Sequence, residues 1–196
     1  MKRFTLSAVA LLATASPALA QEYDVLIRGG TVYDGSGAPG RRADVAIQDG
    51  RIFDIDESVS VEAAVVIDAS GKIVAPGFVD IHSHGDIVLA WPSLDRLSLI
   101  EGRIAQGITT EIIGNCGLGA SPLFGHGAEL LPQINGWMTP ASFDWGWRDV
   151  AGYFDHLEAL GLPLNVGTLV PHGALRLGAA HLAPGEAREI AAELRA

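Results

Sequence analysis

Residues 77–85 read GFVDIHSHG, so two histidines follow directly after an apolar run. Side chains alternate between the two faces of an extended strand, so we expect His82 and His84 to point the same way and Ser83 the other way. Two neutral imidazoles on one face can share a cation, and zinc is among the metals that nitrogen ligands suit. The spacing alone leaves open a second interpretation, a pair of solvated histidines that ends a strand.

The neighbouring segments predict a parallel sheet. The near-continuous apolar run at residues 73–81 suits a strand that is buried on both faces. A second run rich in β-branched residues, at 107–113, leads to Cys116, the single cysteine of the chain. Cys116 therefore follows the second strand as the histidines follow the first, at the end where active sites of β/α barrels assemble.

Three segments resemble the amidohydrolase superfamily, in particular its D-aminoacylase (N-acyl-D-amino-acid deacylase) branch. They are residues 77–84, residues 114–117 and residues 165–170. The resemblance implies a metal-dependent hydrolase of non-peptide C–N bonds, with Zn²⁺ as cofactor and a small N-acyl amino acid as substrate. It also implies that His82, His84 and Cys116 are metal ligands.

The resemblance further implies that the remaining histidine ligands and a general-base aspartate lie beyond Ala196. We therefore expect the chain to be the N-terminal part of a longer enzyme and to be inactive alone. A complete TIM barrel typically takes ~250 residues and at least ~200, and this chain has 196. The predicted fold class is α/β: an incomplete (β/α) TIM-type barrel of about three β/α units at residues 76–196, preceded by a small β-sandwich at residues 21–75.

Within these domains, the sequence predicts individual elements from periodicity and turn signals. Asp49-Gly50 is a strong hairpin turn between two strands, whereas Gly29-Gly30 is expected to join two strands by a turn. Helices with apolar spacings of three and four are predicted at residues 93–105 and 150–160, and a last helix begins near residue 184. The third barrel strand is predicted at residues 164–169.

Residues 1–20 have the pattern of a secretory signal peptide. Lys2 and Arg3 precede an apolar run, and a small-residue site ends at Ala20, after which we expect cleavage. The run is shorter than the ~20 apolar residues of a membrane span, so a secreted or periplasmic protein is expected, with an uncleaved anchor or a buried helix as the alternatives. A lone cysteine is unusual in an oxidising compartment, and Cys116 could be a metal ligand or a small buried hydrophobe. The flanking Asn115 and Gly117 favour the ligand.

Composition excludes several classes of partner. A chain with 48% hydrophobic and 18% charged residues is typical of a globular protein rather than a disordered one. Its formal net charge of −10 argues against nucleic acid and against an anionic membrane surface, because phosphates would be repelled.

Other side chains are candidates for the site. His172, after the third predicted strand, is a candidate substrate-binding residue, whereas the other histidines outside the pair are interpreted as surface or structural: His126, His156 and His181. Asp86 could orient a ligand histidine, contact substrate or cap the strand end. Aromatic residues in the long connection at residues 117–147 could line a pocket or pack the loop onto the barrel: Trp137, Phe143, Trp145 and Trp147.

Two alternative functions remain open from the sequence. One is another amidohydrolase activity, on cyclic amides or dipeptides, because those relatives share the His-x-His strand. The other is an inactive exported fragment that binds metal weakly or aggregates through the open edges of its sheet.

Overall fold

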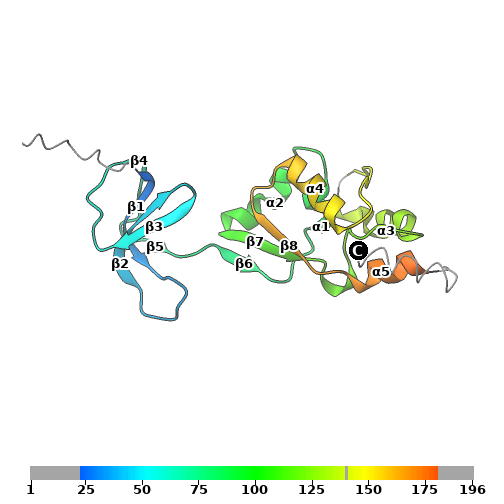
Figure 1. Ribbon diagram of the computed structural model, residues 1–196, viewed down its shortest axis with the longest axis horizontal. Coiled ribbons are helices and arrows are strands. Elements are labelled where there is room, and N and C mark those ends of the chain that lie inside the picture. The colour runs from blue at the N-terminus through cyan, green and yellow to red at the C-terminus, as the bar shows by residue number, and fades with distance from the viewer. Residues whose placement is uncertain (1–22, 140, 181–196) are drawn as a thin grey trace, which may run out of the picture. The chain divides into compact units, whose positions relative to one another are not determined.

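The computed structural model describes residues 23–139 and 141–180, and the chain divides into two compact units, Met1–Pro76 and Gly77–Ala196 (Figure 1). The predicted signal peptide, His181 and the helix predicted near residue 184 lie outside the described residues. None of the helices formed by the described residues is long and apolar enough to cross a membrane.

The first unit contains a five-stranded sheet built around its first strand. The strands are β1 (Tyr23–Val32), β2 (Arg41–Gln48), β3 (Arg51–Asp56), β4 (Ala63–Asp68) and β5 (Ile73–Val74). Their order is β3-β2-β1-β4, and β5 also pairs with β1. β2 and β3 form the predicted hairpin, and the backbone of Asp49 and Gly50 is left-handed (φ 51° and 69°), as a type I′ turn requires.

The predicted turn at Gly29-Gly30 is wrong, because β1 runs without a break from Tyr23 to Val32. The register of β1 against β2 shifts between Ile27 and Gly30, which marks a β-bulge. Gly29 has a φ of 72°, and its N–H donates to Asp44 Oδ1 at 2.7 Å. A glycine inside a strand pattern signals either a turn or a bulge, and here the second applies.

Both faces of this sheet carry apolar side chains. Leu26 and Ala46 belong to a cluster on one face, and Val32 and Val45 to a cluster on the other. The described residues of this unit supply a single sheet. Three apolar side chains of β4 are about half exposed: Val65 (52%), Val66 (53%) and Ile67 (47%).

The second unit combines a three-stranded parallel sheet with helices. Its strands are β6 (Phe78–Asp80), β7 (Ile108–Ile113) and β8 (Asn165–Thr168), in the order β6-β7-β8. The helices are α1 (Asp86–Ala90), α2 (Arg96–Ala105), α3 (Gly127–Asn135), α4 (Val150–Leu160) and α5 (His172–Ala179), with 3₁₀ turns η1 (Asn115–Gly117) and η2 (Gly136–Met138). The helix predicted at 150–160 is confirmed with the same bounds. The strands predicted at 107–113 and 164–169 and the helix predicted at 93–105 are confirmed with slightly shorter bounds.

The apolar run at residues 73–81 does not form one strand buried on both faces. Ile73–Val74 is β5 of the first unit, and Pro76, which lacks an N–H, follows it. Phe78 and Val79 of β6 are 62% and 55% exposed. β6 is an edge strand whose partner among the described strands is β7, so its side chains lack a second neighbour to cover them.

The long connection after β7 is more structured than the sequence indicates, because it contains α3 and η2. Pro132 lies inside α3, and an interior proline argues against a helix in a sequence-based prediction. Trp147 is buried and donates from Nε1 to the carbonyl of Ala120 at 2.6 Å. Phe143 and Trp145 pack against the same core, whereas Trp137 is 77% exposed. The packing interpretation therefore holds for three of the four aromatic residues.

Candidate metal centre

Three predicted ligands from two neighbouring strands come together at the carboxyl edge of the second sheet. One donor atom each of His82, His84 and Cys116 lies within 4.8 Å of the other two. His82 Nε2 is 3.1 Å from Cys116 Sγ, and the two imidazole centroids are 5.6 Å apart. Ligand atoms of a tetrahedral zinc with bonds of about 2.0–2.3 Å lie roughly 3–4 Å apart, so this arrangement needs little change to hold one ion.

The histidines face the same side although β6 ends before them, at Asp80. The ladder continues past that end, because the N–H of Ser83 donates to the carbonyl of Ile112 on β7 at 3.0 Å. The carboxylate of Asp80 accepts from the N–H of His82 at 3.1 Å. Ser83 is buried, whereas His82 is exposed and His84 is half-buried, as expected for side chains that alternate.

The backbone around Cys116 is left-handed at three positions. Gly114 and Gly117 have φ values of 79° and 74°, and Cys116 itself has a φ of 57°. A residue with a Cβ loses about 1–2 kcal/mol in this conformation, and such strain concentrates at functional sites. A Cβ at Gly114 would overlap the carbonyl oxygen of Leu169, so the backbone directly after β8 leaves no room for a side chain there.

Asn115 links the two segments that carry the ligands. Its side chain is buried, and Nδ2 donates to the carbonyl of Ile112 at 2.7 Å and to the carbonyl of Ser83 at 3.3 Å. The amide thus ties the turn before Cys116 to the residue between the two histidines. Neither contact of Asn115 is predictable from the sequence, since both carbonyls belong to residues whose positions depend on the sheet.

Asp86 also stabilises the turn at residues 114–117, through a hydrogen bond to Gly114. It is 3% exposed, and Oδ1 accepts from the N–H of Gly114 at 2.9 Å. Burial raises the pKa of Asp86 to about 6. Its carbonyl accepts from the hydroxyl of Tyr153 at 2.7 Å, and burial likewise raises the pKa of that phenol well above its usual value. Of the roles considered for Asp86, the geometry favours a cap on the neighbouring strand end.

The donor set suits zinc, and one ring retains unused binding capacity. A thiolate with two imidazoles is a common zinc donor combination. Nδ1 of His84 is buried and makes no hydrogen bond within the described part of the chain. A buried polar atom without a partner is costly. A metal ion or a hydrogen-bond donor at Nδ1 would remove this cost, so the His84 imidazole can still bind one.

The other candidate residues lie outside this cluster. His172 is the exposed first residue of α5, and the backbone of its neighbour Gly173 packs against Gly117, so α5 begins beside the cysteine turn. His156 Nε2 lies 2.8 Å from the carbonyl of Ala90, and its ring contacts Trp147, which is a structural role as predicted.

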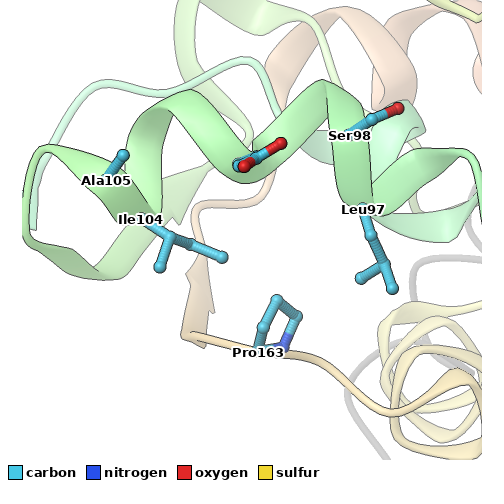
Figure 2. Close-up of a pocket in the computed structure, with 6 residues that line it drawn as sticks. Leu97, Ser98, Ile104, Ala105 and Pro163 are labelled. Carbon is cyan, nitrogen blue, oxygen red and sulfur yellow. The ribbon is translucent and has the colours of Figure 1, made fainter.

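An apolar groove of about 430 Å³ lies on another part of the second unit. Figure 2 shows Leu97 and Ile104 of α2 pointing toward Pro163, which precedes β8. None of the residues that line this groove is a candidate site residue.

The second unit and part of the first match a known family and several characterised proteins. The model of the amidohydrolase family matches residues 65–193. An N-acyl-D-glutamate deacylase of Alcaligenes xylosoxydans xylosoxydans is 40% identical over 161 residues, which are 81% of this chain and 30% of that protein.

Two solved structures have similar folds. The N-acyl-D-glutamate deacylase of Bordetella bronchiseptica, complexed with zinc and a phosphonate inhibitor, matches with a TM-score of 0.68 and 39% identity, over 83% of this chain and 32% of that one. A D-aminoacylase described as having a binuclear metal centre matches with a TM-score of 0.70 and 29% identity, over 88% of this chain and 35% of that one. This chain therefore spans about a third of the length of these relatives.

Proposed function

We propose that this chain supplies the first ligands of a zinc site in an enzyme that hydrolyses N-acyl-D-amino acids. The premise is that the chain belongs to the amidohydrolase family. The observation that carries the proposal is the convergence of His82, His84 and Cys116, whose donor atoms lie within 4.8 Å of one another. The similar N-acyl-D-glutamate deacylases support the substrate class, because their name specifies an N-acyl-D-amino acid.

The three side chains would have distinct roles toward the metal. A zinc ion held by these residues would polarise the scissile carbonyl and lower the pKa of water to about 7. His82 and His84 would contribute neutral nitrogen donors, and Cys116 would contribute a thiolate, which lowers the net charge of the centre and strengthens its hold on the ion. Asp86 and Asn115 would keep the turn at residues 114–117 in place through their bonds to Gly114, Ser83 and Ile112.

Three protein ligands without a base do not complete a hydrolase. A general base must move the proton from water to the leaving amine, and none of the three proposed ligands is free for that role. We assign the base to an aspartate beyond Ala196, together with further histidine ligands, as the resemblance implies. His172, at the start of α5 beside the cysteine turn, is assigned to substrate binding.

The finer architecture belongs to the same proposal. Residues 76–196 would form about three β/α units of a TIM-type barrel, and residues 21–75 a small β-sandwich. In support, β6, β7 and β8 are parallel and helices follow each strand, and the half-exposed apolar residues of β4 offer a surface for a second layer. The leader pattern at residues 1–20 supports export, with cleavage after Ala20, and the negative charge disfavours nucleic acid as partner.

Cobalt titration tests the metal site directly. Co²⁺ bound to a thiolate gives a charge-transfer absorption band, so the chain should show this band, and Cys116→Ser should lose it while retaining its circular dichroism. An equal band in Cys116→Ser, or none in the unaltered protein, would refute the site.

A second assay tests the reaction. N-acetyl-D-glutamate, N-acetyl-L-glutamate, a hydantoin and a dipeptide are compared as substrates of a longer chain that contains residues 1–196, with and without chelator. Chelator-sensitive release of acetate from the D-isomer alone is expected. Turnover of the hydantoin or the dipeptide instead would reassign the substrate, and full activity of residues 1–196 alone would refute the assignment of the base beyond Ala196.

A further inference from the structure

We infer that Glu111 is a positioning residue for the metal site, which acts through Ser83 on the two histidines. The inference rests on the proposed function, because it concerns how this chain holds its ligands. It adds a residue of β7 that contacts none of the three donors.

Glu111 is a buried carboxylate in the central strand of the sheet. The residue is 0% exposed. Oε1 lies 3.2 Å from Arg103 Nη1, and Oε2 accepts from the hydroxyl of Ser83 at 2.7 Å. A buried ion pair can often be replaced by apolar residues without loss of stability. Stability alone is therefore a weak reason for a glutamate at this position.

Ser83 uses every polar group it has, and most of its partners lie on or next to β7. Its N–H donates to Ile112 and its carbonyl accepts from Asn115. Its hydroxyl donates to Glu111 and accepts from the N–H of Gly85 at 3.1 Å. Since Ser83 lies between His82 and His84 in the chain, its orientation determines where both imidazoles point.

The ion pair also packs tightly under the end of the ligand segment. A Cβ at Gly85 would lie 2.6 Å from Glu111 Oε2 and 2.9 Å from Arg103 Nη1, so a side chain there would require the ion pair to shift. Arg103 keeps its side chain 28% exposed, and water can reach it when the carboxylate is removed. Loss of Glu111 should therefore release Ser83 without leaving a fully buried unpaired cation.

Cobalt affinity of the full chain tests the inference, with Co²⁺ as the probe. Glu111→Met removes the acceptor at similar volume, Ser83→Ala removes the donor, and Glu111→Gln keeps an acceptor for Ser83. Loss of a side chain that orients a metal ligand typically lowers metal affinity by about 10–100-fold. Glu111→Met and Ser83→Ala should therefore each weaken Co²⁺ binding by that factor. Glu111→Gln should stay close to the unaltered protein. The double variant Glu111→Met/Ser83→Ala should bind Co²⁺ no more weakly than the single variant of lower affinity, because both changes break the same hydrogen bond.

Arg96→Gln is the matched control for a general loss of stability. Arg96 is a buried charged residue of α2, the helix that also carries Arg103. Its guanidinium donates to the carbonyls of Leu160 and Gly161 rather than to the segments that carry the metal ligands. It should lower the urea midpoint without changing the cobalt affinity or spectrum.

The outcomes separate the two proposals. No thiolate–cobalt band in the unaltered chain would sink the metal site itself. A normal band with unchanged affinity in Ser83→Ala and Glu111→Met, or equal weakening in Arg96→Gln, would overturn the positioning role and leave the metal site standing. If Glu111→Met fails to fold, Ser83→Ala decides alone, because it leaves the Glu111–Arg103 pair in place.

Discussion

Gly114→Ala should disrupt the cysteine turn more strongly than an ordinary glycine substitution. Gly114 has a φ of 79°, and a Cβ there would overlap the carbonyl oxygen of Leu169 and lie 3.0 Å from its carbonyl carbon. The left-handed conformation costs alanine about 1–2 kcal/mol, and overpacking against fixed backbone adds about 1–3 kcal/mol. The free energy of unfolding should fall by about 2–5 kcal/mol. Cobalt affinity should also fall, since Cys116 is two residues away.

Gly161→Ala is a control for backbone strain without a steric clash. Gly161 has a φ of 67° and a ψ of 114°, which lies outside the left-handed helical region, and a Cβ there meets nothing within 4 Å. This variant should therefore lose about 1–3 kcal/mol from strain alone and keep the unaltered affinity for Co²⁺. Leu169 directly follows β8, so a loss of cobalt affinity in Gly114→Ala alone identifies the clash between the turn and this part of the chain.

Urea denaturation followed by tryptophan fluorescence provides the assay. All four tryptophans lie in the second unit, at positions 91, 137, 145 and 147, so their emission reports on that unit alone. Cobalt titration of the same samples gives the affinity. Unaltered cobalt affinity in Gly114→Ala, with a urea midpoint no lower than that of Gly161→Ala, would refute the clash between the turn and Leu169.

Three further predictions concern the same unit. In chelator-treated protein, ionisation of Asp86 opposes folding, because folding raises the pKa of this carboxyl from 3.8 to about 6. The stabilisation by the protonated carboxyl is therefore complete below pH 3.8 and is lost as pH rises through about 6. Asp86→Asn should gain up to about 3 kcal/mol relative to the unaltered chain between pH 4 and 6, and parallel urea midpoints across that range would contradict this. Cys116→Gly should be about 1 kcal/mol more stable than Cys116→Ala without metal, since Cys116 has a φ of 57°, and the reverse order in urea would argue against the left-handed turn. Trp147→Phe should lose about 1–3 kcal/mol because the carbonyl of Ala120 loses its buried donor; thermal unfolding checks this, and an unchanged midpoint would remove the proposed anchor of the long connection.

The parts of the site that depend on local geometry could be predicted from the sequence. His82 and His84 share a face because side chains alternate along extended backbone, and this holds even though β6 ends at Asp80. Cys116 joins them because neighbouring parallel strands end at the same edge of the sheet. Both inferences need only strand direction and spacing.

Contacts between distant positions were not accessible in the same way. Ser83 and Glu111 are 28 residues apart, and a glutamate within a β-branched run gives no local sign of the serine it will meet. The sequence predicts a turn at Gly29 and the structure has a bulge there, because glycine in a strand pattern fits both. Pro132 gives no local sign that α3 forms around it, and the continuous apolar run at residues 73–81 gives no sign that it contributes a strand to each of two sheets.

The central place of β1 determines when the first unit can be completed during synthesis. β1 pairs with β2 and also, in parallel, with β4 and β5, so its last partner is Ile73–Val74. At about 5–20 residues per second, the ribosome needs roughly 2–8 s to add the chain between the end of β1 and the end of β5. The β2–β3 hairpin can close early within that interval, whereas one edge of the nascent β1 stays open to chaperones or to other strands until translation has passed Val74.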